Sequence, residues 1–239
     1  MMTKPFLEKI NRKANRLRAL GRDTSAVAMV EFAFGAPLIL AAGLMGVETA
    51  YFAMTHMQVS QIAMQVADNA SRVGENDVLV SRKVYESDIN DTFVGAEKLG
   101  DNYDIFGQGR IIISSLQKNG LGGENNGQTI RWQRCRGAKQ FDSTYGVEGD
   151  GADDGSFKGM GDAPHWKDWI RAEDGTAVIF VEVSYTYDPI TPFEFFGDEE
   201  IHYTAAFNVR DSRDLTRLYQ TNPASPVSSC SVYSADRPT

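Results

Sequence analysis

The longest apolar run in this chain lies near its N-terminus. Between Val27 and Val47 the sequence has a single charged residue, Glu31. A helix needs about 20 apolar residues to cross the hydrocarbon core of a bilayer. The run therefore predicts a transmembrane helix, and a lone carboxylate inside such a helix indicates a functional residue because burying it there is costly.

The next segment, residues 49–74, has the 3.6-residue period of an amphipathic helix. Its apolar positions are Phe52, Val59, Ile62, Ala63, Val66, Ala67 and Ala70. Since no Gly or Pro separates it from the apolar run after Gly46, we expect one continuous helix from about Val27 to Arg72, about 70 Å long. Gly74 is the expected helix stop.

The remaining residues, 75–239, predict a mixed domain. Residues 85–100 fit a short helix capped by Ser87. Four segments rich in β-branched or alternating residues predict strands: 110–117, 128–135, 176–188 and 200–211. Because turn-forming residues separate these strands into two hairpins, the expected fold class is α+β. It has a long N-terminal helix, transmembrane in its first half, packed on an antiparallel sheet of about four strands.

Charge is unevenly distributed along the chain. The net charge is −8, but residues 1–26 hold seven Lys/Arg against two carboxylates, which gives +5 for this leader and −13 for the rest. Basic residues next to a span mark its cytoplasmic side. The leader 1–26 is therefore expected in the cytoplasm, followed by the helix 27–74 and an exported domain 75–239. The acidic domain argues against a nucleic-acid partner.

Two cysteines, Cys135 and Cys230, fall in the exported part. In an oxidising compartment an even pair is most simply one disulfide, the alternative being two unpaired thiols. Closing a loop of roughly 95 residues contributes about 4 to 5 kcal/mol in the chain-entropy account. The bridge would tie the C-terminal tail to the domain.

A secretory signal peptide is an alternative interpretation of residues 1–42. The small residues Ala41, Ala42 and Gly43 resemble a cleavage site, and cleavage there would release a secreted binding module. The apolar run continues past this point, and Glu31 interrupts what should be a plain apolar segment. Both observations favour an anchor.

No catalytic constellation is evident, so we expect a protein that is not an enzyme and has no cofactor. The three histidines, His56, His165 and His202, are scattered in sequence without a nucleophile or metal-ligand motif. A Gly/Asp-rich loop, residues 146–166, contains Asp150, Asp153 and Asp154. Its spacing does not fit an EF-hand, because Ala152 falls at a ligand position and no terminal Glu follows.

We therefore expect a mobile acidic loop at 146–166 and no metal site.

A second charged group lies closer to the C-terminus, in the segment VRDSRDL. Its members, Asp211, Arg213 and Asp214, are expected to be solvated charges or a local ion-pair cluster.

The N-terminal segments resemble a known family. A basic leader, a small residue, the run VAMVEFAFGAPLIL, then Glu48 and a helix of the type VSQIAMQVADNASRVG are similar to TadE-like proteins. These are minor pilins or pseudopilins of the tight-adherence (Flp-type) pilus system. RWQRCRG (131–137) and AAFNVRDSRDLTRLY (205–219) resemble the exported part of such proteins, less specifically. The larger TadG-like relatives fit worse, since the sequence lacks the Asp-x-Ser-x-Ser motif of a von Willebrand A domain.

The resemblance implies a single-pass protein of the bacterial inner membrane with its C-terminal domain in the periplasm, reaching the cell surface on assembly. It implies pilin and pilus-assembly partners, and a role in pilus assembly and surface adhesion. A prepilin peptidase would cut between Ala26 and Val27, making Glu31 the fifth mature residue and Phe32 the aromatic sixth. The family usually has Gly at the position of Ala26.

Assembly gives Glu31 a physical purpose. A carboxylate in an apolar helix bundle needs a cationic partner, and the new α-amino group of Val27 on a neighbouring subunit can serve. If the leader is not cleaved, that amine does not exist. The alternative is then an unprocessed single-pass envelope scaffold, in which Glu31 pairs with a partner protein or stays protonated.

Overall fold

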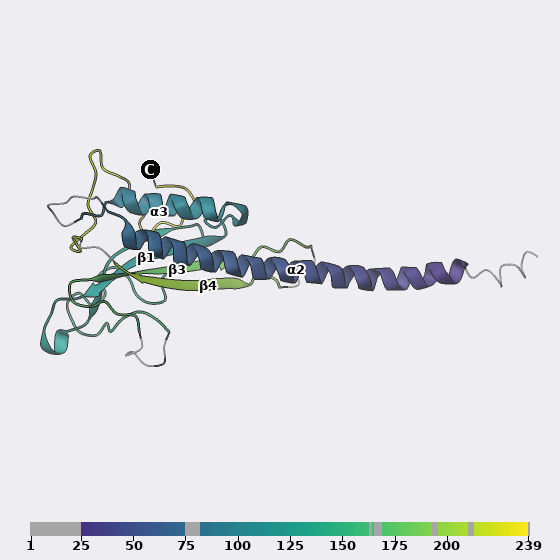
Figure 1. Ribbon diagram of the computed structural model, residues 1–239, viewed down its shortest axis with the longest axis horizontal. Helices are drawn as coiled ribbons and strands as arrows, with labels where there is room; N and C mark the ends of the chain where they lie inside the picture. Colours follow the sequence, from purple (N-terminus) through teal and green to yellow (C-terminus); the bar gives the residue numbers. More distant parts are fainter. Residues whose placement is uncertain are drawn as a thin grey trace, which may run out of the picture. The chain divides into compact units, whose positions relative to one another are not determined.

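The computed structural model describes residues 25–74, 82–162, 164, 169–192, 196–209 and 213–238. The chain divides into two compact units, Met1–Ala50 and Tyr51–Thr239, which are considered separately below. Its elements, drawn in Figure 1, are α2 (Ser25–Arg72), α3 (Glu86–Leu99), η1 (Asp101–Tyr103), β1 (Gly109–Lys118), η2 (Gly123–Asn125), β2 (Gln128–Arg136), β3 (Ala177–Thr186) and β4 (Glu200–Asn208). The expected α+β class is confirmed, whereas residues 1–24 of the basic leader lie outside the described residues.

The helix α2 is continuous over 48 residues, as the sequence predicts. It includes Pro37, whose missing N–H removes one intrahelical hydrogen bond. The helix ends at Arg72, and Gly74 follows with φ at 131°, a conformation that glycine tolerates because it has no Cβ. The expected stop at Gly74 is confirmed.

Arg213 caps the C-terminal end of α2. Its guanidinium donates hydrogen bonds to three backbone carbonyl groups, those of Ala70, Ser71 and Val73. The last carbonyls of a helix have no intrahelical partner, and a cation there also interacts favourably with the helix dipole. The prediction of a solvated charge is therefore wrong for Arg213, which is buried. Asp214 bonds locally to Thr216, and Asp211 lies outside the described residues.

The short helix α3 begins two residues earlier than the predicted cap allows. Its N-cap is Tyr85 and not Ser87, which lies inside the first turn. The Tyr85 N–H donates to the Asp88 carboxylate at 2.8 Å, satisfying a polar group at the helix start. Ile89, Phe93 and Ala96 are buried on one face, as their spacing predicts.

The four strands form one antiparallel sheet in the order β2-β1-β3-β4. β1 pairs with β2 and β3 pairs with β4, so both predicted hairpins are confirmed. The central pair is β1 with β3, in a register that places Ile112 opposite Glu182 and Ser114 opposite Phe180. The second half of α2 and helix α3 cover one face of this sheet (Figure 1).

The helix-covered face holds the main core. Val59, Ile62, Val66 and Ala70 of α2 are fully buried against alternate residues of the central strands. The opposite face, here called the outer face, is also buried on β1 and β3, because both central strands have nearly every residue buried. It contains a smaller apolar cluster around Leu116 and polar side chains between apolar ones.

The long segment between β2 and β3 is attached to the edge of β2. The Ile130 N–H donates to the Asp150 carbonyl at 3.1 Å, the Gly149 N–H donates to the Ile130 carbonyl at 2.8 Å, and the Gln128 N–H donates to the Phe157 carbonyl at 2.9 Å. The described residues of the loop 146–166 are thus held by strand-like hydrogen bonds, unlike the mobile loop that the composition predicts. Pairing of this kind protects a sheet edge.

Candidate functional site

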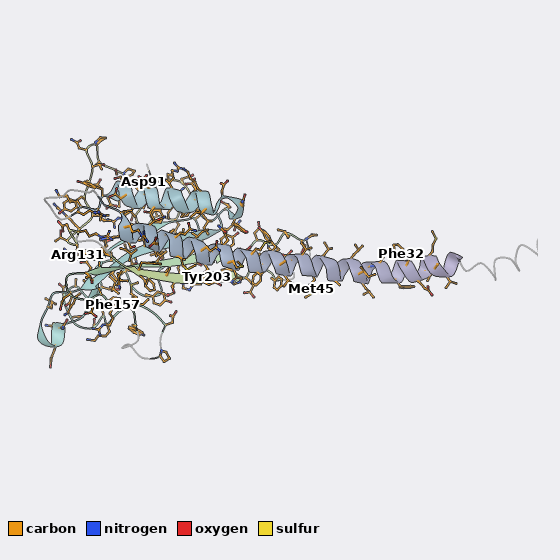
Figure 2. All side chains as sticks on the ribbon, viewed as in Figure 1. Phe32, Met45, Asp91, Arg131, Phe157 and Tyr203 are labelled. Carbon is orange, nitrogen blue, oxygen red and sulfur yellow. A yellow bond between two sulfur atoms is a disulfide. The ribbon has the colours of Figure 1, made fainter. Side chains whose placement is uncertain are left out.

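The first candidate site is the surface of α2 in the unit Met1–Ala50. Among the described residues, α2 is the one helix long and apolar enough to cross a membrane. Its large apolar side chains point outward: Phe32, Leu38 and Ile39 are 74, 73 and 74% exposed, and Figure 2 shows Phe32 and Met45 projecting from the helix. An exposed apolar surface of this kind is consistent with a membrane anchor.

The predicted processing and assembly residues lie together on the first turns of this helix. Val27, which is 56% exposed, is one helical turn from Glu31, so both lie on one face. Glu31 is exposed and has no bonding partner within the described part of the chain. Ala26 belongs to the helical backbone, and its side chain lies outside the described residues. The carboxylate therefore lies exposed on the surface of the helix.

Three glycines in the same unit have no packing role within the described part of the chain. A Cβ added at Gly35, Gly43 or Gly46 would meet nothing within 4 Å. By contrast, a Cβ at Gly137 would lie 2.2 Å from the Gly109 carbonyl oxygen, so that glycine is required by its own fold. Small residues on an exposed apolar helix allow a neighbouring helix to approach closely.

The predicted disulfide is present in the unit Tyr51–Thr239. Cys135 on β2 and Cys230 in the C-terminal tail are bonded, with their Cα atoms 4.7 Å apart. Backbone hydrogen bonds continue the attachment on either side, since the Cys135 N–H donates to the Ser228 carbonyl and the Gly137 N–H to the Ser234 carbonyl, both at 2.9 Å. The tail thereby covers the part of the β2 edge that the loop 146–166 leaves open.

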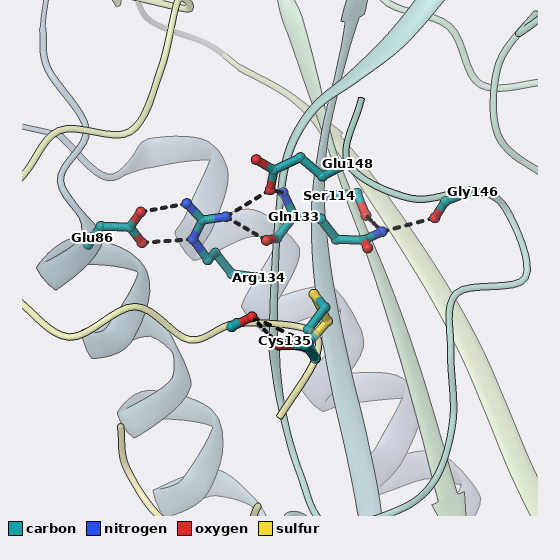
Figure 3. Close-up of polar contacts among 10 residues, drawn as sticks. Glu86, Ser114, Gln133, Arg134, Cys135, Gly146 and Glu148 are labelled. Atoms are coloured by element: carbon teal, nitrogen blue, oxygen red, sulfur yellow. Dashed lines mark hydrogen bonds and ion pairs between the residues drawn. A yellow bond between two sulfur atoms is a disulfide. The ribbon is translucent and has the colours of Figure 1, made fainter. Parts of the chain in front are cut away.

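An arginine network next to the disulfide was not predicted from the sequence (Figure 3). Arg134 on β2 pairs with Glu86 of α3 at 2.5 Å and with Glu148 of the loop at 2.9 Å. Burial lowers the pKa of Arg134, but the hydrogen bonds and charges of its two carboxylate partners outweigh burial and raise it. The network joins helix, sheet and loop, and it keeps the guanidinium fully charged.

A second arginine, this one fully buried, anchors the tail. Arg110 on β1 is fully buried and donates to the carbonyls of Gly137, Val232 and Cys230. Its guanidinium lies 4.0 Å from the centre of the Tyr233 ring, an arrangement favourable for a cation. Burial lowers the pKa of Arg110.

These groups surround a cleft of about 640 Å³ beside the disulfide. Its polar lining includes Asp142 and Glu148, but the Arg110 and Arg134 guanidiniums are already engaged by protein groups. No nucleophile–base pair is formed by the described side chains of this lining. The described part of the chain also contains no group of three or more His, Cys, Asp or Glu residues able to hold a metal ion.

One buried carboxylate lies on the outer face of the sheet. Glu182 on β3 is fully buried and accepts hydrogen bonds from the Ser143 hydroxyl and from the Thr144 N–H, the latter at 3.1 Å. Burial raises the pKa of Glu182 by more than these hydrogen bonds lower it. Its role is to hold the start of the long loop against the sheet, and the alternating pattern of β3 gave no indication of it.

No family model matches this chain, and no match is found among curated proteins or solved structures.

Proposed function

We propose that this protein is a TadE-like minor pilin or pseudopilin that is anchored in the bacterial inner membrane and supports assembly of a tight-adherence pilus. The observation that carries the proposal is that the two halves of α2 have different surroundings. One half of a single helix exposes apolar residues and one carboxylate, while the other half is the core helix of an α+β domain. A subunit that is anchored in a bilayer and carries a folded domain needs a helix with both kinds of surface.

The exposed side chains at the start of α2 support an assembly role for that region. Glu31 faces outward one turn from Val27, and the glycines at 35, 43 and 46 leave room for neighbouring helices. In an apolar bundle the Glu31 carboxylate requires a cation, and the α-amino group of Val27 from a processed neighbour supplies it. Phe32 packs among the neighbouring helices. Other pilins, pilus-assembly proteins and a prepilin peptidase are the partners in this proposal.

The orientation follows from charge and chemistry. The leader is basic, which favours a cytoplasmic N-terminus, and the domain contains a disulfide, which is typical of proteins in an oxidising compartment such as the periplasm. Aromatic residues gather where α2 enters the domain, with the rings of Tyr51 and Tyr103 stacked at 6.0 Å. Tyrosines are enriched at membrane–water interfaces, which is consistent with a span ending at Ala50.

Sequencing the N-terminus of the mature protein tests processing. A start at Val27 supports a pilin, whereas an intact Met1 supports the second candidate, an unprocessed envelope scaffold that Ala26 at the cleavage position favours. A start after Ala42 would mean release by a signal peptidase, as a secreted binding module.

The role of Glu31 is tested separately by Glu31→Gln, which keeps the side-chain shape and removes the charge. We expect pili to be lost while the amount of protein in the membrane is unchanged. Normal piliation and adhesion of this variant would refute the proposed role. Asn69→Asp, which adds a carboxylate outside the span at an exposed position of α2, is the matched control and should leave piliation unchanged.

A further inference from the structure

The part of α2 that belongs to the unit Tyr51–Thr239 exposes an uncharged face. From Tyr51 to Ala67 the helix has no Asp, Glu, Lys or Arg. Met54, Met57 and Met64 are 52, 62 and 47% exposed. A helix on the surface of a soluble domain normally carries charges opposite its core face. An exposed row of flexible apolar methionines is instead typical of a protein contact surface.

Helix α3 provides the comparison, because it covers the same face of the same sheet. Its 14 residues include five charges, Glu86, Asp88, Asp91, Glu97 and Lys98. Asp91, labelled in Figure 2, and Lys98 are exposed. The uncharged surface is therefore a property of α2 and not of the helical layer as a whole.

Four exposed residues of α2 have coiled-coil spacing. Met54, Met57, Gln61 and Met64, here called the methionine seam, follow one another at intervals of three, four and three residues. This is the spacing of the a and d positions that face a partner helix. The seam is about 15 Å long at 1.5 Å per residue. The α2 residues that pack on the sheet, such as Val59 and Val66, are fully buried on the opposite side.

We propose that the methionine seam binds the same seam on a second copy of this chain, with the two helices parallel. The parallel direction rests on the proposed function, because two copies anchored by the preceding segment leave the same side of one membrane. In a parallel pair each seam residue faces its own counterpart, so any charge would face a like charge. The seam contains none, so parallel pairing of two copies brings no like charges together.

The C-terminal end of the seam and its one polar residue agree with this pairing. The next position in the spacing is Asp68, which is bonded to Arg72 of its own helix at 2.9 Å, so the seam stops where self-pairing would bring two carboxylates together. Within the seam, Gln61 is the one polar member. A single polar residue at such a position specifies register by hydrogen-bonding to its counterpart.

Cross-linking of the full-length chain in membranes tests the proposal. The two native cysteines are joined in a disulfide, so Met57→Cys or Met64→Cys adds the one free thiol. Oxidation should give a product of twice the 26.4 kDa chain mass from both variants. Asp91→Cys, exposed on α3, is the matched control and should give none. A product of another mass, or equal cross-linking of the control, would overturn the proposal.

Opposite charges placed at position 57 of two co-expressed chains distinguish specific pairing of the seams from mere proximity of the chains. In the Met64→Cys background, Met57→Glu and Met57→Lys should each abolish the cross-link when expressed alone, and co-expression should restore it as a mixed pair. If each charged variant cross-links as well as its parent, the proposal fails. Retention of the Cys135–Cys230 disulfide shows that the variants remain folded.

The seam can be tested independently of the anchor. Retention of the chain in membranes after an alkaline wash is measured in parallel. If the chain is released by the wash, the proposed anchor fails, while the same cross-linking in detergent solution still decides whether the seams pair.

Discussion

The guanidinium of Arg213 lies 3.3 Å from the carbonyl oxygen of Val73, to which it donates a hydrogen bond across 140 positions of sequence. This contact connects the segment after β4 to the end of the long helix. It replaces the intrahelical partners that the last carbonyls of α2 lack.

Arg213→Met should destabilise the domain, because it leaves these carbonyls without their cationic donor while keeping the apolar stem. We expect the free energy of unfolding to fall by about 2 kcal/mol, the range for a buried charged hydrogen bond. Urea unfolding of the full chain in detergent measures it. Arg237→Met is the control, since Arg237 makes an exposed ion pair with Glu97 at 3.2 Å and should contribute less than about 1 kcal/mol. Equal losses in both variants would contradict a capping role.

Removal of the disulfide should lower the free energy of unfolding by more than the Arg213→Met substitution does. The bond between Cys135 and Cys230 closes a loop with a sequence separation of 95. The free energy of unfolding of a double Cys→Ser variant should therefore be about 4 kcal/mol lower than that of the parent. The same loss should follow addition of a reductant to the parent protein. The double variant should not respond to reductant, and any further loss there would indicate an effect unrelated to the disulfide.

Glu182 should make stability depend on pH. Its pKa is raised in the folded state by burial, so its contribution to stability is present below 4.5, the ordinary value, and is lost as pH rises through the raised pKa. Glu182→Gln removes this dependence, and the variant should gain stability relative to the parent as pH rises. Unfolding at a series of pH values measures the difference, which should be smallest in acid.

Glu200 provides a control of opposite sign. Its pKa is lowered, first by the Ser184 hydroxyl that donates to it at 2.7 Å and also by Lys139. Its contribution is therefore present above the ordinary value and is lost as pH falls through the lowered pKa. Glu200→Gln should lose stability relative to the parent at neutral pH. Two variants with the same pH profile would show that these carboxylates do not determine it.

Membrane retention should depend on the centre of the span. Ile39→Arg places a charge in the middle of the apolar run and should disfavour insertion by about 2.5 to 3.5 kcal/mol. We expect a smaller fraction of the chain to resist an alkaline wash. Ile190→Arg, at a position 50% exposed in the domain, should behave as the parent does. Full retention of Ile39→Arg would argue against a transmembrane role for this segment.

Local periodicity explains why much of the fold could be predicted. The 3.6-residue period through Val59, Ile62 and Val66 defined the helix, and the β-branched runs defined the strands. The predicted N-cap at Ser87 was wrong because Tyr85 allows Asp88 to bond back to the N-cap N–H. Choices of this kind depend on tertiary contacts, since Tyr85 also pairs with Tyr219 of the tail.

The buried charges could not be predicted for the same reason. Arg110, Arg134 and Arg213 look like ordinary surface residues in sequence. Arg110 and Arg213 are buried and Arg134 is half-buried, each by segments far away along the chain. The loop 146–166 appeared mobile from its glycines and aspartates, but its backbone pairs with β2. By contrast, the exposed residues Val27, Glu31 and Phe32 were correctly placed on one helix, because their position depends on local helical geometry alone.

The attachment of residues 213–238 sets an order of events in the cell. This segment follows the whole sheet in the chain, so a ribosome makes it after every strand. Until it arrives, α2 has an uncapped end and part of the β2 edge is open. Chains interrupted before Arg213 would present an unpaired strand edge to proteases and to one another. A chain truncated before Arg213 would therefore lack the cap of α2 and the tail's cover of the β2 edge together.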